Sequence, residues 1–122
     1  MELEKLSHQE EEAMQAVWKS GEGSIKLFLE NMPSPGVPYT TLASTIKNLE
    51  KKGYLASRMV GNAYLFKPLV GEDEYKERFM NGFVRDYFAN SYKELVNFFV
   101  EEKKLSAKEL KEIIDLIEKS GS

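Results

Sequence analysis

The 122-residue sequence predicts a mainly α-helical fold with one small β-hairpin. Over most of the chain, apolar residues recur every three or four positions, which is the spacing of a helix with one buried face. Residues 55–66 break this pattern, because two short strand-like runs flank Gly61-Asn62, a pair suited to a tight hairpin turn. After Gly71 the pattern is wholly helical. We therefore expect two domains, residues 1–70 and 71–122.

Two helices and a turn are predicted before residue 40. Ser7 followed by Glu10 is a capping-box pattern that begins the first helix, and Trp18 lies on the apolar stripe of that helix as a core residue. The glycines at 21 and 23 end this helix, and Ser24 caps a second one. The proline-rich segment 33–38 is unsuited to regular structure and forms the turn that follows.

Residues 40–52 form the third predicted helix, which has two different faces. Leu42, Ile46 and Leu49 share one face at intervals of four and three residues. Short polar and basic residues occupy another face, namely Thr40, Ser44, Lys47 and Lys51. Gly53 ends the helix, because glycine takes the left-handed cap conformation without steric cost. Residues 55–60 and 63–66 then form the hairpin.

A helix with a small, basic free face followed by a basic hairpin is the arrangement of a winged helix-turn-helix. Small side chains let such a helix enter the major groove, where serine, threonine and asparagine reach base edges and lysine attracts phosphate. We therefore expect the helix at 40–52 and the wing at 55–67 to contact DNA. The candidate residues are Thr40, Thr41, Ser44, Thr45, Lys47, Asn48 and Lys51 in the helix, with Arg58 and Lys67 in the wing.

The distribution of charge supports this expectation better than the net charge does. The whole chain carries a formal charge of −3. Residues 38–67 hold five basic residues against one acidic residue, whereas residues 71–122 hold nine basic and twelve acidic residues. The positive charge is therefore concentrated on the predicted helix and wing, and a local patch sets the field that a duplex meets.

The composition argues against several other classes of protein. The chain has no cysteine, which excludes disulfides, thiolate metal sites and cysteine catalysis. The one histidine, His8, is expected to be a solvated residue in the first turn of a helix. We therefore expect no enzyme activity, no metal and no cofactor. No run approaches the ~20 apolar residues that span a membrane, and no leader peptide is recognisable, so we expect a cytoplasmic protein with no membrane partner.

The C-terminal residues predict three amphipathic helices. Acidic residues begin the first at 72–74, and capping-box patterns at Ser91 and Ser106 begin the other two. A unit of about fifty residues buries too little surface to hide so many apolar side chains, so we expect a second copy of the chain to cover them. The alternative is that the helices pack back on their own winged helix. The candidate dimerisation residues are Tyr75, Phe79, Phe83, Tyr87, Tyr92, Val96, Phe99, Ile113 and Ile117.

Three stretches of the sequence resemble the penicillinase-repressor family of bacterial regulators, the BlaI/MecI/CopY type. They are Leu6-Ser7-x-x-Glu10-x-x-x-Met14-x-x-x-Trp18, Tyr39-Thr40-Thr41-Leu42-x-Ser44-Thr45-Ile46-x-x-Leu49-x-x-Lys52-Gly53 and Tyr64-x-Phe66-x-Pro68. The resemblance covers roughly residues 6–118. It implies a homodimeric repressor with an N-terminal winged helix and a C-terminal helical dimerisation domain.

The sequence departs from that family in two places. Asn48 stands where family members often carry arginine, in the second half of the recognition helix. The copper-sensing branch has a cysteine-rich tail, and the absence of cysteine argues against that form of copper sensing.

The resemblance also implies a cleavage site. In the β-lactam-responsive branch, a membrane sensor leads to cleavage of an Asn-Phe bond in a dimerisation helix. Asn97-Phe98 resembles that bond, although the flanking residues align better with Phe98-Phe99 as the bond that is cut. The alternative is that both phenylalanines belong to the dimer core. A helical bond enters a protease only after local unfolding, which favours this second interpretation.

Together these features predict a homodimeric, sequence-specific DNA-binding transcriptional repressor that binds a two-fold operator. Its expected partners are double-stranded DNA, a second copy of the chain and, if cleavage occurs, a sensor-linked protease. The alternative from another class is a winged-helix adaptor that binds protein and no DNA. The two hypotheses differ in salt dependence, because contacts to several phosphates weaken steeply as salt rises.

Overall fold

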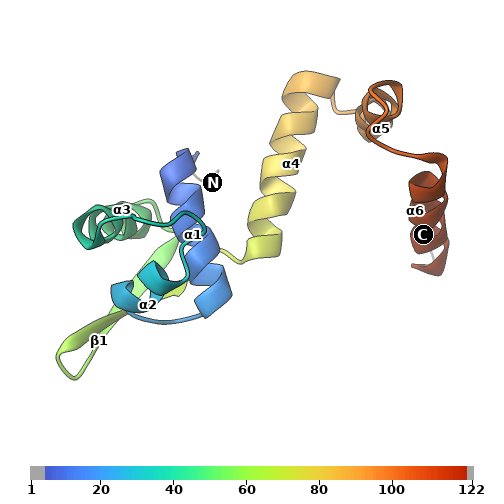
Figure 1. Cartoon of the computed structure of the whole chain (residues 1–122). Helices are drawn as coiled ribbons and strands as arrows, with labels where there is room; N and C mark the ends of the chain where they lie inside the picture. Colours follow the sequence, from blue (N-terminus) through green and yellow to red (C-terminus); the bar gives the residue numbers. More distant parts are fainter. Residues whose placement is uncertain (1–4, 121–122) are drawn as a thin grey trace. The chain divides into compact units, whose positions relative to one another are not determined.

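The computed structural model describes residues 5–120 and shows six helices and one hairpin in that range (Figure 1). The predicted class, mainly α with a small antiparallel hairpin, is confirmed. The elements in chain order are α1 (His8–Ser20), α2 (Ile25–Glu30), α3 (Tyr39–Lys51), β1 (Leu55–Val60), β2 (Ala63–Pro68), α4 (Glu72–Phe88), α5 (Tyr92–Glu101) and α6 (Ala107–Lys119).

The chain divides into two compact units. The first ends at Lys76 and the second begins at Glu77, so the division by contacts lies within α4. The division at residue 70 was based on the helical pattern and stays a prediction about which residues fold independently. The two units are described separately below.

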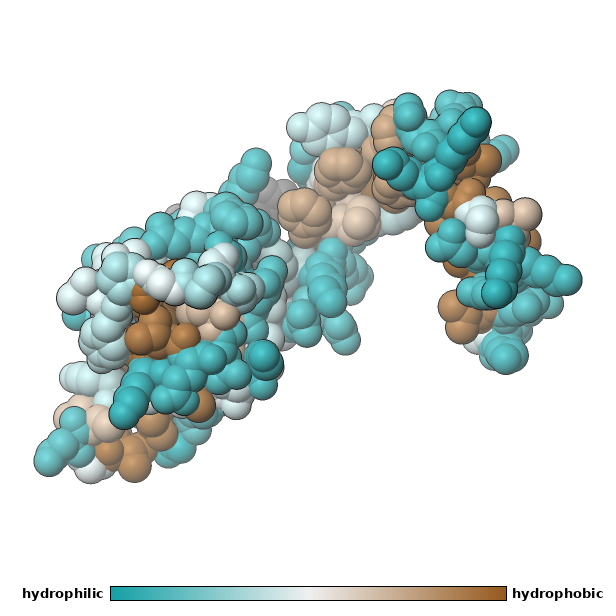
Figure 2. All heavy atoms as spheres, viewed as in Figure 1, coloured by the Kyte–Doolittle hydropathy of each residue, from teal (hydrophilic) through white to brown (hydrophobic). Residues whose placement is uncertain are grey.

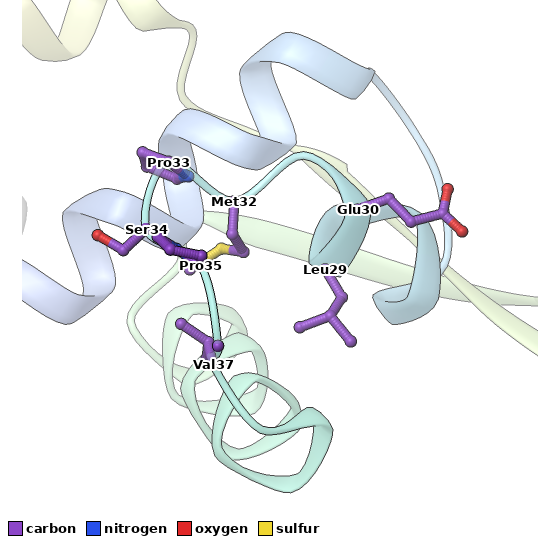
Figure 3. Close-up of a pocket in the computed structure, with 8 residues that line it drawn as sticks. Leu29, Glu30, Met32, Pro33, Ser34, Pro35 and Val37 are labelled. Atoms are coloured by element: carbon purple, nitrogen blue, oxygen red, sulfur yellow. The ribbon is translucent and has the colours of Figure 1, made fainter.

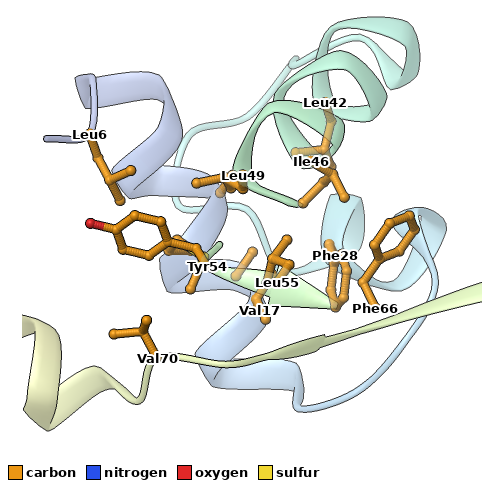
Figure 4. Close-up of a cluster of buried hydrophobic side chains, with 13 residues drawn as sticks. Leu6, Val17, Phe28, Leu42, Ile46, Leu49, Tyr54, Leu55, Phe66 and Val70 are labelled. Atoms are coloured by element: carbon orange, nitrogen blue, oxygen red, sulfur yellow. The ribbon is translucent and has the colours of Figure 1, made fainter. Parts of the chain in front are cut away.

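The first unit is built around one apolar core. Figure 4 shows side chains from α1, α3 and both strands converging on this cluster. The helix caps predicted from the sequence are present, since the Ser7 hydroxyl accepts a hydrogen bond from the Glu10 amide and the Ser24 hydroxyl accepts one from the Leu27 amide. The buried residues of the core are Leu6, Ala13, Met14, Ala16, Val17, Phe28, Leu42, Ile46, Leu49, Tyr54, Leu55, Phe66 and Val70.

The hairpin gains a third chain segment that the sequence did not predict. The two strands pair in the register Leu55 with Pro68 through Val60 with Ala63. Gly23 then forms a bridge to β2: its N–H donates to the Phe66 carbonyl at 3.0 Å, and its carbonyl accepts from the Phe66 N–H at 2.8 Å. A Cβ at Gly23 would lie 2.5 Å from Cδ2 of Leu27, so a larger residue there would require the end of the Leu27 side chain to move. A bridge of one residue has no sequence periodicity, so the pattern of apolar residues did not predict it.

A partly buried ion pair joins the start of α1 to the end of α3. One carboxylate oxygen of Glu10 accepts from the Ser7 amide at 2.9 Å and from the Lys52 ammonium at 2.8 Å. The Lys52 ammonium also donates to the Lys5 carbonyl at 3.3 Å. Burial alone would raise the pKa of Glu10, but the bonds from Lys52 and Ser7 and the charge of Lys52 outweigh it and hold the pKa below its ordinary value.

This pair predicts a pH-dependent contribution to stability. Glu10→Gln should lower the free energy of unfolding of the first unit by about 1–3 kcal/mol at pH 7, because a charge-assisted bond to Lys52 is lost. Since the folded pKa of Glu10 is depressed, its contribution is fully present above the unfolded pKa, near 4.5, and is lost as pH falls through the folded value. The gap between the variant and the natural protein should therefore shrink in acid.

Urea unfolding followed by fluorescence would measure this gap, because the one tryptophan, Trp18, lies in the first unit. Glu30→Gln on the exposed side of α2 is the matched control and should leave stability unchanged at both pH values. A gap that stays constant from pH 7 to pH 3 would contradict the assignment of the effect to the Glu10 carboxylate.

The second unit exposes most of its apolar side chains. Among its described residues, Val84 and Leu95 are the buried hydrophobic ones, and α6 contains no buried residue. Figure 2 shows apolar side chains on the surface of these helices. The Ser106 capping box is present, and the Ser91 hydroxyl accepts from the Glu94 amide at 3.1 Å. None of the helices within residues 5–120 combines the length and apolar character needed to cross a membrane.

Candidate nucleic-acid interface

Helix α3 presents a polar face opposite its apolar stripe. Leu42, Ile46 and Leu49 are buried in the core of the first unit. Five of the predicted contact residues lie on the opposite side and are exposed, and we call them the α3 exposed face: Thr40, Ser44, Lys47, Asn48 and Lys51. Thr41 is half-buried at the edge of this face. The core thus fixes the rotation of α3 about its axis and turns these five side chains outward.

Thr45 does not belong to the α3 exposed face. Its side chain is only 7% exposed, and its hydroxyl donates to the Thr41 carbonyl at 3.0 Å. The position follows Leu42 by three residues and directly precedes Ile46, so it falls within the buried stripe. Its polar residue type suggested a DNA contact, but its helical position places it in the core, where the carbonyl of Thr41 satisfies the hydroxyl.

Within residues 5–120, no side chain caps the first turn of α3. The N-cap is Pro38, which makes no side-chain hydrogen bond to the first amides, and Tyr39 at the first helical position is 52% exposed. Amides at a helix N-terminus favour an anion when no side chain caps them. The signal was visible in the sequence, because proline supplies no oxygen to act as a cap.

In the wing, the guanidinium of Arg58 is paired with a carboxylate from outside the hairpin. Its Nε and Nη2 atoms each donate to one oxygen of Glu22, both at 2.9 Å. The hydrogen bond and the charge of Arg58 lower the pKa of Glu22, and the carboxylate in turn raises the pKa of Arg58. Lys67, the other basic residue of the wing, is exposed.

The positive charge of the interface is therefore smaller than the sequence count indicated. Lys52 is paired with Glu10, and Arg58 is paired with Glu22. Three lysines of the region form no salt bridge with any residue in the described range 5–120: Lys47, Lys51 and Lys67. The two pairing carboxylates lie before residue 38, so a count restricted to residues 38–67 did not include them.

A small cavity of about 320 Å³ lies at the turn between α2 and α3 (Figure 3). Leu29, Met32 and Val37 contribute apolar side chains to it, and Glu30 is the one titratable residue of its lining. Within residues 5–120 no group of three or more acidic, histidine or cysteine residues is placed to hold a metal ion. The lining of the cavity therefore supplies one carboxyl group, and most of its other residues form the turn that leads into α3.

The sequence model of the family described as penicillinase repressor matches residues 6–119. The chain belongs to the penicillinase repressor family. It is 22% identical over 117 residues to the penicillinase repressor of Bacillus licheniformis, with 95% of this chain and 91% of that protein covered. It is 26% identical over 117 residues to the methicillin resistance regulatory protein MecI of Staphylococcus aureus strain N315 and of Staphylococcus epidermidis, with 94% of each chain covered.

Membership confirms the resemblance noted in the sequence and places the chain among transcriptional repressors. The match extends through both compact units, so this member of the penicillinase repressor family contains the helical second unit as well as the winged helix. The aligned relatives are regulatory proteins and not enzymes.

Most of the predicted dimerisation residues of this family member are exposed. Phe83 is half-buried and stacks on Phe79 with ring centroids 6.3 Å apart, and it contacts Tyr87 at 5.0 Å. The others within the second unit have exposed fractions of 38–74%, and they are Phe79, Tyr87, Tyr92, Val96, Phe99, Ile113 and Ile117. Large apolar side chains at this exposure are typical of a surface that another molecule covers.

Tyr75 is the exception, because the structure places it in the first unit. Its ring lies 5.6 Å from that of Trp18 and 6.1 Å from that of Tyr54. Its hydroxyl donates to the Glu11 carboxylate at 2.5 Å, and burial together with this bond raises the pKa of Tyr75 far above its ordinary value. Tyr75 thus anchors the first turn of α4 to the winged helix, although the i+4 spacing to Phe79 suggested a shared face.

Asn97 and Phe98 both lie inside α5, and the Phe98 side chain is 45% exposed. The Phe98 ring also contacts Phe88 of α4, with centroids 5.8 Å apart. Cleavage at this bond would first require α5 to unwind locally. The exposed apolar surface of Phe98 and Phe99 favours the alternative, in which both residues contribute to a dimer surface.

Proposed function

We propose that this chain is a homodimeric transcriptional repressor that binds a two-fold operator through α3 and the wing. The α3 exposed face carries this proposal. It combines small hydroxyl side chains, one amide and two lysines on a helix whose opposite side is buried in the core. Bound to a promoter, the dimer would exclude polymerase, and it would act in the cytoplasm, where the operator is.

The side chains of the α3 exposed face suit a major groove. Thr40 and Ser44 are short enough to let the helix approach base edges, and Asn48 can bond both N6 and N7 of adenine. Lys47 and Lys51 form no salt bridge with residues 5–120, so their charge is available to phosphates. Lys67 of the wing would contact a phosphate on the flanking backbone.

The helical second unit supports the homodimer. Its exposed aromatic and aliphatic side chains lie on α4, α5 and α6, and a second copy would cover them with the same surface. A two-fold dimer presents two α3 helices to two half-sites of a palindromic operator.

A winged-helix adaptor that binds protein is the alternative, and the α3 exposed face argues against it. Protein interfaces depend on large buried anchors such as tryptophan, tyrosine or arginine. The α3 exposed face has none, and Tyr39 is the one large exposed hydrophobic residue of that helix.

Two substitutions on α3 test the proposal. Lys51→Ala should weaken binding to all duplexes similarly and lower the salt slope of the affinity by about one unit, because one phosphate contact is lost. Asn48→Ala should instead reduce the preference for particular base pairs, by roughly 1–3 kcal/mol if the contact is bidentate. Titrations on an operator selected from random duplexes, and on mismatched versions of it, would measure both effects.

Lys26→Ala provides the matched lysine control, since Lys26 is exposed on α2 outside the α3 exposed face. It should leave both the affinity and the salt slope unchanged. If neither Lys51→Ala nor Asn48→Ala alters DNA binding, α3 is not the recognition helix. If the natural protein shows no salt-dependent DNA binding at all, the adaptor hypothesis replaces the repressor.

A further inference from the structure

Arg58 of the wing forms a bidentate ion pair with Glu22, whereas a residue that contacts phosphate would need its charge free. Two N–H groups of Arg58 donate to the two oxygens of Glu22, both at 2.9 Å. The Arg58 side chain is 63% exposed, whereas that of Glu22 is 31% exposed. Glu22 directly precedes Gly23, whose two hydrogen bonds to Phe66 fix the backbone at this point. The carboxylate is thus held at the wing by the fold, and it orients the guanidinium.

The guanidinium keeps a second set of donors. Arginine carries five N–H groups in a planar fork, and Glu22 accepts two of them, from Nε and Nη2. The other three donate to no acceptor within the described range of the chain. One N–H of Nη1 and the remaining N–H of Nη2 are parallel, so the tip of Arg58 presents two donors in a fixed direction.

The net charge of the Arg58–Glu22 pair determines which kind of acceptor the free N–H groups of Arg58 can bind. Glu22 neutralises Arg58, so the pair as a whole gives little long-range attraction to a phosphate. If Arg58 left Glu22 for a phosphate, one anion would replace another. The Glu22 carboxylate would then lie beside the polyanion with only the charge of Lys67, which forms no salt bridge with it, to offset its own. An acceptor on a base edge carries no net charge, so it can accept from the tip while the pair stays intact.

The end of the hairpin fits a groove as well. Beyond Arg58, the next cross-strand pair joins Met59 and Tyr64, which are 57% and 59% exposed, and the strands end one pair later. The four residues between them, from Val60 to Ala63, are uncharged. A tip of this composition can contact sugars and base edges but offers no cation to a phosphate.

We propose that Arg58, positioned by Glu22, is a specificity-determining residue of the wing that contacts acceptor atoms on base edges in a groove of the operator. Lys67 supplies the phosphate contact of the wing. The inference rests on the proposed function and deepens it, because it assigns to the wing a part in sequence recognition in addition to α3.

The test uses the full-length chain and an operator selected by that chain from random duplexes. Arg58→Lys keeps the charge but removes the planar fork. It should reduce the preference for the selected operator over unrelated duplex by about 10- to 100-fold and leave the salt slope unchanged. Lys67→Ala, in contrast, should weaken binding to all duplexes similarly and lower the slope by about one unit.

A second variant removes the pair without changing net charge. Glu22→Gln combined with Arg58→Ala should reduce the same preference by about 10- to 100-fold, and it should leave the salt slope and the affinity for unrelated duplex within about twofold. Its matched control is the exposed pair of Glu72 and Lys76, which are 3.6 Å apart, in the form Glu72→Gln with Lys76→Ala. The control should change neither quantity. Glu22→Gln alone frees the charge of Arg58 and should steepen the slope by about one unit.

Different outcomes would overturn the role of Arg58 and the proposed function. Operator preference within twofold of the natural protein in Arg58→Lys would overturn the specificity role while DNA recognition by α3 stands. So would a uniform loss of affinity with a shallower slope in the double variant, which would identify Arg58 as a phosphate contact. Selection that enriches no sequence with the natural chain would overturn the proposed function and this inference together. Urea unfolding followed by Trp18 fluorescence checks that each variant is folded.

Discussion

A fragment ending at Pro68 is expected to be about 3–5 kcal/mol less stable to unfolding than a fragment ending at Lys76. The difference comes from the segment between the hairpin and α4. Val70 is only 5% exposed, and its carbonyl accepts a hydrogen bond from the Trp18 indole at 2.9 Å. Loss of that side chain costs about 1.5–3 kcal/mol of burial, and the orphaned indole adds about 1 kcal/mol or more. The ring contacts of Tyr75 with Trp18 and Tyr54 contribute a further ~0.5–1.5 kcal/mol.

Urea unfolding of the two fragments, followed by Trp18 fluorescence, would measure the difference. A third fragment ending at Gly71 retains Val70 but lacks Tyr75, and it should lie between the other two. Light scattering should show the fragment ending at Lys76 as a monomer, because the exposed apolar residues of α4, α5 and α6 are absent. Equal stability of all three fragments would show that residues 1–68 fold on their own, as a domain boundary near residue 70 predicts.

The elements of the first unit could be predicted because their signals are local. Ser7 and Glu10 are three residues apart and cap α1 as the pattern indicated. Gly53 takes a φ of +87° directly after Lys52, the C-cap residue of α3, as a left-handed stop requires. Gly61 takes a φ of +61° at the hairpin turn. Each signal acts within a few residues, so the sequence contains all that is needed to recognise it.

The contacts that set the electrostatics of the interface are not local. Arg58 and Glu22 are 36 residues apart, and Lys52 and Glu10 are 42 residues apart. Neither pair has a spacing that a pattern search detects, and each neutralises one of the basic residues counted on α3 and the wing. The bridge between Gly23 and Phe66 likewise depends on how the tertiary fold brings two segments together.

Residue type was a weaker guide than helical position. Thr45 is polar but lies in the buried stripe of α3, and Tyr75 is aromatic but packs in the first unit. The end of α5 is likewise not marked by the residue types that usually end a helix. The turn after α5 places Lys103 at a φ of +59°, a conformation for which glycine or asparagine is the usual marker.

The largest expected effect concerns the apolar surface of α6. In the single chain, Ile113 is 40% and Ile117 is 52% exposed, and α6 has no buried residue within the described range. Because these side chains gain little burial within the protomer, replacing them should leave the winged helix folded. If the same residues are buried between two copies, two carboxylates there would be unpaired charges in an apolar interface and would prevent dimerisation.

The double variant Ile113→Glu with Ile117→Glu is therefore expected to be monomeric at micromolar concentration, where the proposed function predicts that the natural chain is a dimer. Two joined winged helices meet the second half-site at high effective concentration, so separating them should reduce affinity for the full operator by ~10²–10⁴ while affinity for one half-site is unchanged. Light scattering and operator titrations measure the two effects. Lys108→Gln with Lys111→Gln makes the same change in net charge on exposed α6 positions outside the predicted dimer set and should retain both properties. A glutamate variant that remains dimeric and binds the operator as the natural chain does would show that α6 lies outside the dimer interface.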